Sequence, residues 1–183
     1  MQSFESVLFA ARAGAEWAWA RIYEELAPPV AGYLRAHGAA DAEDLTGEVF
    51  LQVVRGLDTF SGPEPAFRAW VFTIAHRRLV DDVRRRTRRP SVPMEPEMLS
   101  DVAGAGGDVT EDATASLDDE RVRAAIAELP PDQRAVLLLR IVGDLTIEQI
   151  AEAVGKRPGA VKALQRRALR RLEGAYPFPA LQR

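Results

Sequence analysis

The sequence of 183 residues contains no cysteine and only two histidines, His37 and His76. Without cysteine the chain can form no disulfide, no thiolate metal site and no cysteine nucleophile. Two histidines are too few for an imidazole-rich metal centre, so we expect no metal and no cofactor. Apolar runs such as Ala135–Leu139 are far shorter than the roughly 20 residues that cross a bilayer, and the N-terminus lacks the basic start of a signal peptide. We therefore expect a soluble, cytoplasmic protein without membrane association.

Charge is unevenly distributed along the chain, although the net charge is only −3. Residues 68–89 carry eight arginines against two aspartates, and residues 121–172 carry eleven basic residues against five acidic ones. Between these blocks, residues 90–120 contain nine acidic residues and no basic one. A single basic helix would more simply be a solvated surface, but two basic blocks favour two surfaces that face a polyanion.

Apolar periodicity predicts an all-α protein with two small helical domains. The first domain covers residues 1–89 and the second covers residues 117–176, followed by a tail over 177–183. Between the domains, residues 90–116 hold three prolines, three glycines and no aromatic side chain. This composition buries too little apolar surface to offset the entropy of ordering, which predicts a flexible acidic linker. No segment has the period of a strand.

Prolines and glycines divide the first domain further. We expect Pro28-Pro29 to break a helix, because neither residue can donate a backbone hydrogen bond. Residues 58–65 contain Gly62, Pro63 and Pro65 and should form a loop. A long helix follows from Ala66 to about Arg88.

The segment 146–171 has the pattern of a helix-turn-helix. Thr146 and Gln149 fit a capping box, Gly155 fits a left-handed C-terminal position, and Pro158 suits the first turn of the next helix. The second half of the segment carries seven basic residues and no acidic one. Because a major groove about 12 Å wide admits one helix, DNA binding is favoured over an ordinary helical hairpin. The predicted contacts are Arg157, Ala160, Lys162, Gln165, Arg166, Arg167 and Arg170.

The long helix over 66–88 combines arginines with Phe67, Trp70 and Phe72. Aromatic rings stack on unpaired bases while guanidinium groups hold phosphates, so this pattern is typical of single-stranded DNA binding. The loop Phe60–Pro65 just before the helix would offer a small pocket for a flipped base. One or two of the three rings could equally belong to the core, since they lie at helical spacing.

A third feature is acidic. Asp41, Glu43, Asp44 and Glu48 surround apolar residues of the predicted helix 42–56. Such a face could dock on a basic partner helix, although acidic residues in a first turn also favour the helix dipole.

These motifs together resemble two regions of bacterial sigma factors, most closely those of the extracytoplasmic-function group. The resemblance covers about residues 15–89 and 117–173, in the family's order. Region 2 is matched by AEDLTGEVF over 42–50, FRAWVFTIA over 67–75 and RLVD over 78–81, and region 4 by LPPDQRAVLLLR over 129–140 together with the helix-turn-helix.

The resemblance implies a promoter-specificity subunit of RNA polymerase that directs transcription initiation and has no catalysis of its own. It implies that region 2 docks on the clamp helices of the largest polymerase subunit, reads the −10 element and holds its melted strand. Region 4 would bind the polymerase flap and read the −35 element as duplex DNA. The resemblance also allows an anti-sigma protein as an inhibitory partner.

The family's functional positions fall on two sets of residues in this sequence. The implied polymerase-docking residues are Asp41, Asp44, Leu45, Glu48, Val49, Phe50 and Gln52. The implied −10 residues, taken together with further basic positions of the long helix, are Phe60, Ser61, Gly62, Arg68, Trp70, Arg77, Arg78, Asp81, Arg84 and Arg85.

Two alternatives stay open. The chain could be a DNA-binding regulator that acts without polymerase, with residues 1–89 as an effector or dimerisation domain. An enzyme has little support, because the sequence shows no nucleophile–base pair, phosphate loop or metal cluster. The apolar residues around Trp17, Trp19 and Tyr23 could face a partner or belong to the core.

Overall fold

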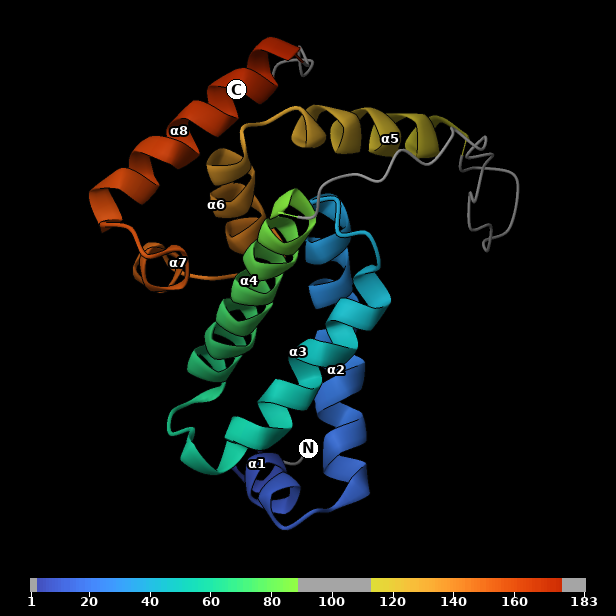
Figure 1. The fold of residues 1–183 in the computed structure, drawn as a ribbon, viewed down its shortest axis with the longest axis vertical. Helices are drawn as coiled ribbons and strands as arrows, with labels where there is room; N and C mark the ends of the chain where they lie inside the picture. The colour runs from blue at the N-terminus through green and yellow to red at the C-terminus, as the bar shows by residue number, and fades with distance from the viewer. Residues whose placement is uncertain (1–2, 89–112, 176–183) are drawn as a thin grey trace.

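The computed structural model describes residues 3–88 and 113–175, and every regular element in these two ranges is a helix, as the sequence predicts (Figure 1). The elements are α1 (Phe4–Arg12), α2 (Glu16–Ala36), α3 (Ala42–Gly56), the 3₁₀-helix η1 (Leu57–Thr59), α4 (Glu64–Arg88), α5 (Ala113–Ala127), α6 (Pro131–Ile141), α7 (Ile147–Val154) and α8 (Pro158–Ala175). The predicted linker over 90–116 lies outside the described residues up to residue 112, but its last four residues belong to helix α5, so the linker prediction is wrong over 113–116. The predicted tail over 177–183 also lies outside the described residues.

Helix α2 runs without interruption through Pro28 and Pro29, so the predicted break is wrong. A proline inside a helix removes one hydrogen bond and costs roughly 3 kcal/mol. Here Pro28 is exposed and Pro29 half-buried, and the carbonyls that lose their donors belong to the exposed Glu24 and Glu25, where water can reach them. The opposite side of the helix outweighs this loss, because each fully buried apolar side chain contributes about 1.5–3 kcal/mol. That side buries Ile22, Leu26, Ala27, Val30, Tyr33 and Leu34.

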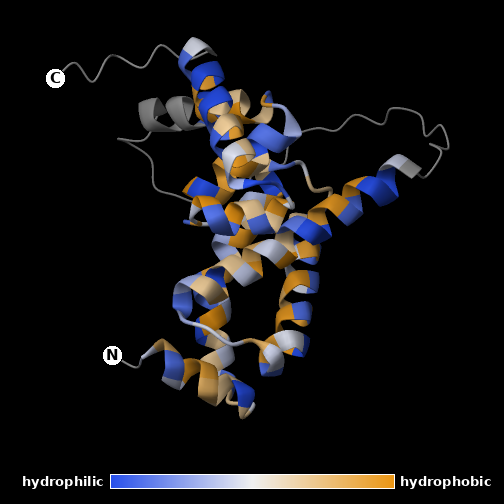
Figure 2. Cartoon of the chain, turned by 90° about the vertical axis from the view of Figure 1, so that its left-hand side faces the viewer, coloured by the Kyte–Doolittle hydropathy of each residue, from blue (hydrophilic) through white to orange (hydrophobic). Residues whose placement is uncertain are grey.

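Helix α4 lies at the centre of the molecule and packs against α3, α2 and α7 (Figure 1). Val71, Phe72 and Ala75 of α4 are completely buried. In Figure 2 the apolar residues form stripes along the helices, as expected where one side of each helix is buried and the other is solvated.

The second part of the chain packs directly on the first, which the sequence did not predict. Buried residues of α6, α7 and α8, among them Leu139, Ile150 and Val161, belong to the same continuous apolar cluster as the core of α1–α4. The main junction joins α7 to α4. The two predicted domains therefore share one core in this structure.

The helix-turn-helix folds locally as its sequence predicts. The Thr146 side chain accepts from the backbone N–H of Gln149 at 3.2 Å, and the Gln149 side chain accepts from the backbone N–H of Thr146 at 2.8 Å. Gly155 ends α7 with φ 65°, a left-handed conformation that disfavours residues with a Cβ. Pro158 is the first residue of α8, also as predicted.

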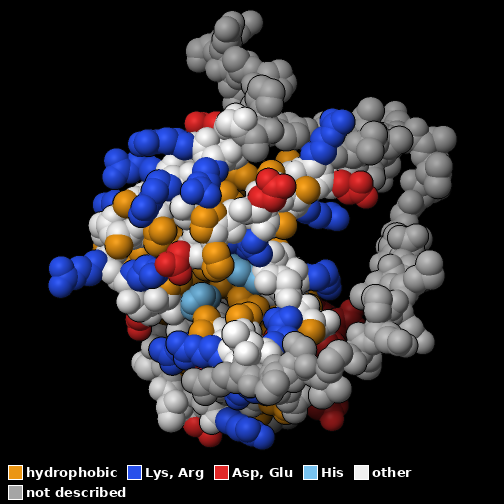
Figure 3. Space-filling model, turned by 45° about the horizontal axis from the view of Figure 1, so that its top comes forward, with side chains coloured by type: hydrophobic (Ala, Val, Ile, Leu, Met, Phe, Trp, Pro, Cys, Tyr) orange, Lys and Arg blue, Asp and Glu red, His pale blue; other side chains and the backbone are white. Residues whose placement is uncertain are grey.

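Both histidines lie in a polar cluster around the buried Tyr33. The Tyr33 hydroxyl and His76 Nδ1 are joined by a hydrogen bond of 2.8 Å. His37 Nδ1 donates to the Tyr33 carbonyl at 3.0 Å, and His37 Nε2 is buried without a hydrogen-bond partner among the described residues. Burial lowers the pKa of His37 to about 4 against the opposing effect of the carbonyl, and burial also lowers the pKa of His76. Figure 3 shows the two rings as pale blue surfaces at the middle of one face.

This cluster predicts a pH-dependent stability. The unfolded chain protonates His37 near pH 6.5, whereas the folded chain resists protonation until about pH 4. Lowering the pH from 7 to 5 should therefore lower the free energy of unfolding by about 2 kcal/mol from this residue, with His76 adding in the same direction. Urea denaturation at several pH values measures the slope, and His37→Gln should flatten it. An unchanged slope in that variant would contradict the assignment.

Candidate nucleic-acid interface

One stripe of α4 faces solvent and carries four of the predicted −10 residues. Trp70, Arg77, Asp81 and Arg84 follow one another at helical spacings of seven, four and three residues. The last three are exposed and Trp70 is half-buried. Phe67 and Phe72 are buried in the core, so Trp70 alone of the three aromatic residues of this helix stays accessible.

The loop before α4 packs against this stripe through Phe60. Its ring stacks on Trp70 with centroids 5.2 Å apart and meets the edge of Phe67 at the same centroid distance. The next two loop residues, Ser61 and Gly62, are exposed. The structure thus brings Phe60, Ser61 and Gly62 together with Trp70 at one end of the stripe.

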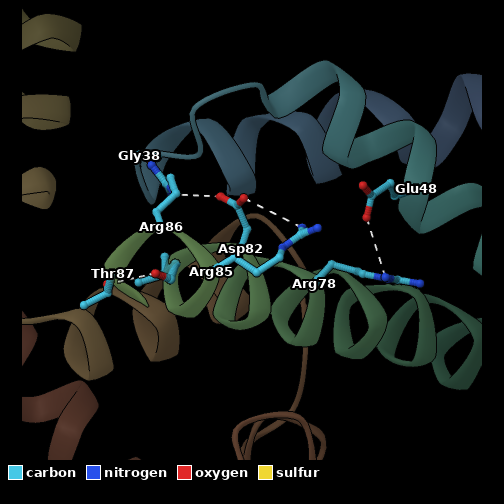
Figure 4. Close-up of polar contacts among 8 residues, drawn as sticks. Gly38, Glu48, Arg78, Asp82, Arg85, Arg86 and Thr87 are labelled. Atoms are coloured by element: carbon cyan, nitrogen blue, oxygen red, sulfur yellow. Dashed lines mark hydrogen bonds and ion pairs between the residues drawn. The ribbon is translucent and has the colours of Figure 1, made fainter. Parts of the chain in front are cut away.

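The neighbouring arginines of α4 are held by carboxylates and carbonyls (Figure 4). Arg78 lies 3.6 Å from a Glu48 oxygen, and its Nε donates to the Gln52 side chain at 2.9 Å. Asp82 pairs with Arg86 at 2.9 Å and with Arg85 at 3.8 Å. Exposed pairs of this kind contribute at most about 1 kcal/mol, so their main effect is to orient the guanidinium groups. Arg78 also links the predicted −10 residues to the predicted docking residues.

The predicted docking surface on α3 is only partly accessible. Leu45, Val49 and Phe50 are core residues, so in this structure a partner cannot reach the apolar centre that the sequence suggested. Burial of these side chains is what holds α3 against α2 and α4. The residues that remain accessible are Asp41, Asp44, Glu48 and Gln52, and Asp41 also caps α3 by accepting from two backbone N–H groups.

The sequence patterns did not predict that two apolar residues of α3 lie at the surface. Leu51 is 58% exposed and Val54 is 50% exposed. They fall outside the stripe of Leu45, Val49 and Val53 that faces the core, which is the signal that could have found them. Tyr23 of α2 packs on the ring of Phe50, the residue before Leu51, while remaining half exposed.

Arg68 does not face the same way as the other −10 residues. Its Nε donates to the carbonyl of Gly143 at 2.8 Å and its Nη2 to that of Val142 at 3.5 Å, in the turn between α6 and α7. A second polar contact lies close by, where the Gln149 amide of α7 donates to the carbonyl of Pro65 at 3.2 Å. The predicted −10 surface is therefore separated here into an outward stripe and one arginine bound to the second part of the chain.

The predicted −35 residues gather on the outer side of α8, with Arg157 directly before its first residue. All are exposed except Gln165, which is half-buried. The inner side of the helix is apolar, with Val161, Leu164 and Ala168 buried against α6 and α7. Figure 3 shows Lys and Arg side chains gathered over this part of the surface. Arg167 Nε donates to the Ala163 carbonyl of the same helix at 3.2 Å. The arrangement presents a basic helix whose long, exposed side chains can reach phosphates and base edges.

The two parts of the chain that carry these surfaces each match a known protein family. Residues 22–89 match the family model described as Sigma-70 region 2, and residues 119–172 match the one described as Sigma-70, region 4. The ECF RNA polymerase sigma factor RpoE of Cereibacter sphaeroides is 33% identical over 159 residues, which cover 86% of this chain and 85% of that protein. The chain belongs to the ECF group of the sigma-70 family.

Other relatives point the same way. The ECF RNA polymerase sigma factor BldN of Streptomyces coelicolor is 35% identical over 93% of this chain, which spans 64% of that protein's length. Among solved structures, RpoE of Bartonella quintana, in complex with the anti-sigma factor NepR, has a TM-score of 0.65 at 19% identity and covers 88% of this chain and 98% of that one. CnrH in complex with the cytosolic domain of CnrY has a TM-score of 0.63 at 23% identity, with coverages of 92% and 94%. These two structures share the fold.

Family membership decides against the hypothesis that the chain is an enzyme. Sigma factors are regulatory subunits of RNA polymerase and not enzymes, so the enzyme hypothesis is set aside. In the part of the chain that the structure describes, no helix is long and apolar enough to cross a membrane. The same residues contain no cluster of potential metal ligands.

The contact of Arg68 with the 142–143 turn predicts that removing this side chain weakens the junction between regions 2 and 4. Arg68→Ala removes both bonds to the 142–143 turn, and a hydrogen bond from a charged group contributes about 1.5–3 kcal/mol. We expect regions 2 and 4 to separate more often, so that small-angle X-ray scattering gives a larger radius of gyration. Arg77→Ala, on the exposed side of the same helix, is the control and should leave the radius unchanged. Equal radii for both variants would contradict the importance of this contact.

Proposed function

We propose that this chain directs transcription initiation by binding core RNA polymerase and recognising the −35 and −10 elements of its promoters. The proposed division is region 2 over 1–89, an acidic linker over 90–112, region 4 over 113–176 with α5 as its first helix, and a tail over 177–183. The observation that carries the proposal is the pair of exposed surfaces, one on α8 and one on α4, in a chain of the sigma family. Because polymerase and chromosomal DNA meet in the bacterial cytoplasm, the protein would act there.

Region 4 would anchor the complex on duplex DNA. The guanidinium groups of α8 can bind phosphates without regard to sequence, and those nearest its N-terminus can read base edges in the major groove. Arg157 precedes the first residue of α8, and its carbonyl accepts from the backbone N–H groups of Ala160 and Val161. Its side chain is exposed at the end of the helix that would enter the groove.

Region 2 would hold the melted −10 strand. Trp70 and Phe60 offer a stacking surface at the start of α4, and Arg77 and Arg84 continue along the exposed stripe at positions suited to phosphates. By binding only unpaired bases, this surface shifts the duplex toward the open state without a chemical step. Asp81, within the same stripe, pairs with Arg84 at 3.9 Å and limits the positive charge there.

The polymerase would dock on the acidic edge of α3. Asp44, Glu48 and Gln52 lie on the accessible side of this helix and complement a basic partner helix. Leu51 and Val54 add apolar area next to this edge. Docking there would leave the −10 stripe of α4 open.

Both promoter elements cannot be bound in the packed arrangement. Elements centred at −35 and −10 are about 25 base pairs apart, roughly 85 Å along the duplex. In the packed arrangement α7 contacts both α4 and α8, packed helix axes lie about 8–10 Å apart, and neither α4 nor α8 is longer than about 37 Å, so the two surfaces are much closer together than this. We therefore propose that regions 2 and 4 separate on the promoter, which frees Arg68 for DNA. An anti-sigma protein, as in the complexes of the similar structures, is a proposed inhibitory partner.

The −35 surface is tested by Arg166→Glu combined with Arg167→Glu. Each reversal replaces an attraction to phosphate by a repulsion, so we expect transcription from a promoter selected by the wild-type holoenzyme to fall at least tenfold. Affinity for core polymerase should be unchanged. Arg35→Glu, an exposed reversal on α2, is the control and should leave transcription intact. Loss of polymerase affinity in the double variant would show that it disturbs the fold instead.

The docking surface is tested by Asp44→Lys combined with Glu48→Lys. The change reverses the charge of the accessible edge of α3 and removes the carboxylate partner of Arg78. We expect the affinity for core polymerase, measured by fluorescence anisotropy, to fall at least tenfold. Glu5→Lys with Glu16→Lys, two exposed reversals outside the residues that match regions 2 and 4, is the matched control. Wild-type affinity in the α3 variant would place the docking surface elsewhere, and no binding by the wild type would favour a regulator that acts alone.

A further inference from the structure

Arg12 is an exposed residue at the end of α1, outside the range 22–89 that matches region 2. Its guanidinium nevertheless contacts the segment that leads into the loop before α4. Nε donates to the carbonyl oxygen of Leu57 at 3.3 Å, and Nη2 donates a shorter bond to the carbonyl of Phe60. Leu57 is the first residue of η1 and Phe60 is the residue after it. One guanidinium therefore spans the whole 3₁₀ turn.

Helix α1, which carries Arg12, is itself held in place by packing and by a hydrogen bond. Val7, Leu8 and Ala11 are buried against the rest of region 2. The indole Nε1 of Trp19, in α2, donates to the carbonyl of Ala11 at 3.0 Å, next to Arg12 itself. Because both the apolar side and the C-terminal turn of α1 are held, the guanidinium is presented to the loop in one place.

One side of the loop is held by contacts within the protein, and the other side is exposed to solvent. The carbonyls of Leu57 and Phe60 point to Arg12, and the Phe60 ring is stacked on Trp70. Within the described residues, the backbone N–H groups of Ser61 and Gly62 have no hydrogen-bond partner, and both residues are exposed. Two donors and the Ser61 hydroxyl thus lie beside an aromatic surface, a combination that suits the acceptor atoms and the flat face of one unpaired base.

We propose that Arg12 is a positioning residue for the capture of one unpaired −10 base by the loop over 60–63. This inference rests on the proposed −10 function of region 2. Arg12 acts through the backbone: by binding the carbonyls of Leu57 and Phe60 on the inner side, it holds the turn in the shape that leaves the N–H donors of the next two residues outward. A lysine cannot replace it, because one ammonium group lacks the planar fork that reaches both acceptors.

The test uses the holoenzyme, assembled from the full chain and core polymerase, and a promoter that the wild-type holoenzyme selects from a randomised pool. Each −10 base of the non-template strand is replaced in turn by an abasic site, and 2-aminopurine fluorescence reports the rate of melting. The measured quantity is the ratio of the rates on the intact and the abasic promoter. The same protein preparation melts both promoters, so a lower folded fraction does not change this ratio.

For the wild type we expect one −10 position whose removal slows melting about tenfold, as the loss of one stacked base predicts. In Arg12→Ala and in Arg12→Lys the penalty at that position should shrink to within about twofold, because a loosened loop no longer discriminates an intact base from a missing one. Arg12→Lys keeps the positive charge at the end of α1, so a matching result in both variants excludes a simple charge effect. Arg55→Ala, an exposed arginine near the same loop, is the control and should keep the wild-type penalty.

Two failures are distinguishable. If the wild type shows no penalty at any −10 position, base capture by region 2 is wrong and the role of Arg12 falls with it. If Trp70→Ala abolishes the penalty while Arg12→Ala and Arg12→Lys retain it in full, base capture stands and the positioning role of Arg12 is overturned.

Discussion

Helix α4 is packed on two sides at once, and this double packing decides where the other elements lie. On one side it buries apolar residues against α2 and α3, and on another it meets α7. Successive residues of a helix point about 100° apart, so a helix held on two sides keeps only a narrow stripe for solvent. This applies to the packed turns of α4, whereas residues 83–87 at its C-terminal end are all exposed. That stripe carries Trp70, Arg77, Asp81 and Arg84. The proposed DNA-binding surface of α4 is thus the part of the helix that is not buried in the core.

The same packing joins two regions that have separate tasks on a promoter. The apolar cluster is continuous across the junction, and the polar contacts of Arg68 and Gln149 lie at its edge. Gln149 is used twice, since its oxygen accepts from the N-cap residue of α7 while its nitrogen donates to the carbonyl of Pro65. The residue that helps to cap the start of α7 therefore also forms a contact between the two regions.

Local features of the fold were predictable from the sequence, and long-range ones were not. The bounds of α3, the capping box of α7 and the left-handed Gly155 follow from residues within a few positions of one another. The break expected at Pro28-Pro29 failed because the burial of residues such as Tyr33 and Leu34 depends on helices far along the chain. For the same reason periodicity identified Leu45, Val49 and Phe50 as an apolar side but not what covers it. The basic residues of α8 were placed on an outer surface correctly, whereas nothing near Arg68 or Arg12 in the sequence reveals their carbonyl partners.

Arg68 binds carbonyl oxygens, which every amino acid supplies. Replacing the side chain of Val142 would leave its acceptor in place, so the sequence of the turn between α6 and α7 can drift without removing this contact. Gly143 is the exception, because a Cβ there would come within 2.6 Å of the Leu139 carbonyl oxygen. The outer residues of α8 have no part in these bonds. A descendant of this protein could therefore acquire a new −35 preference by changing α8 while the junction between its two regions stays as it is.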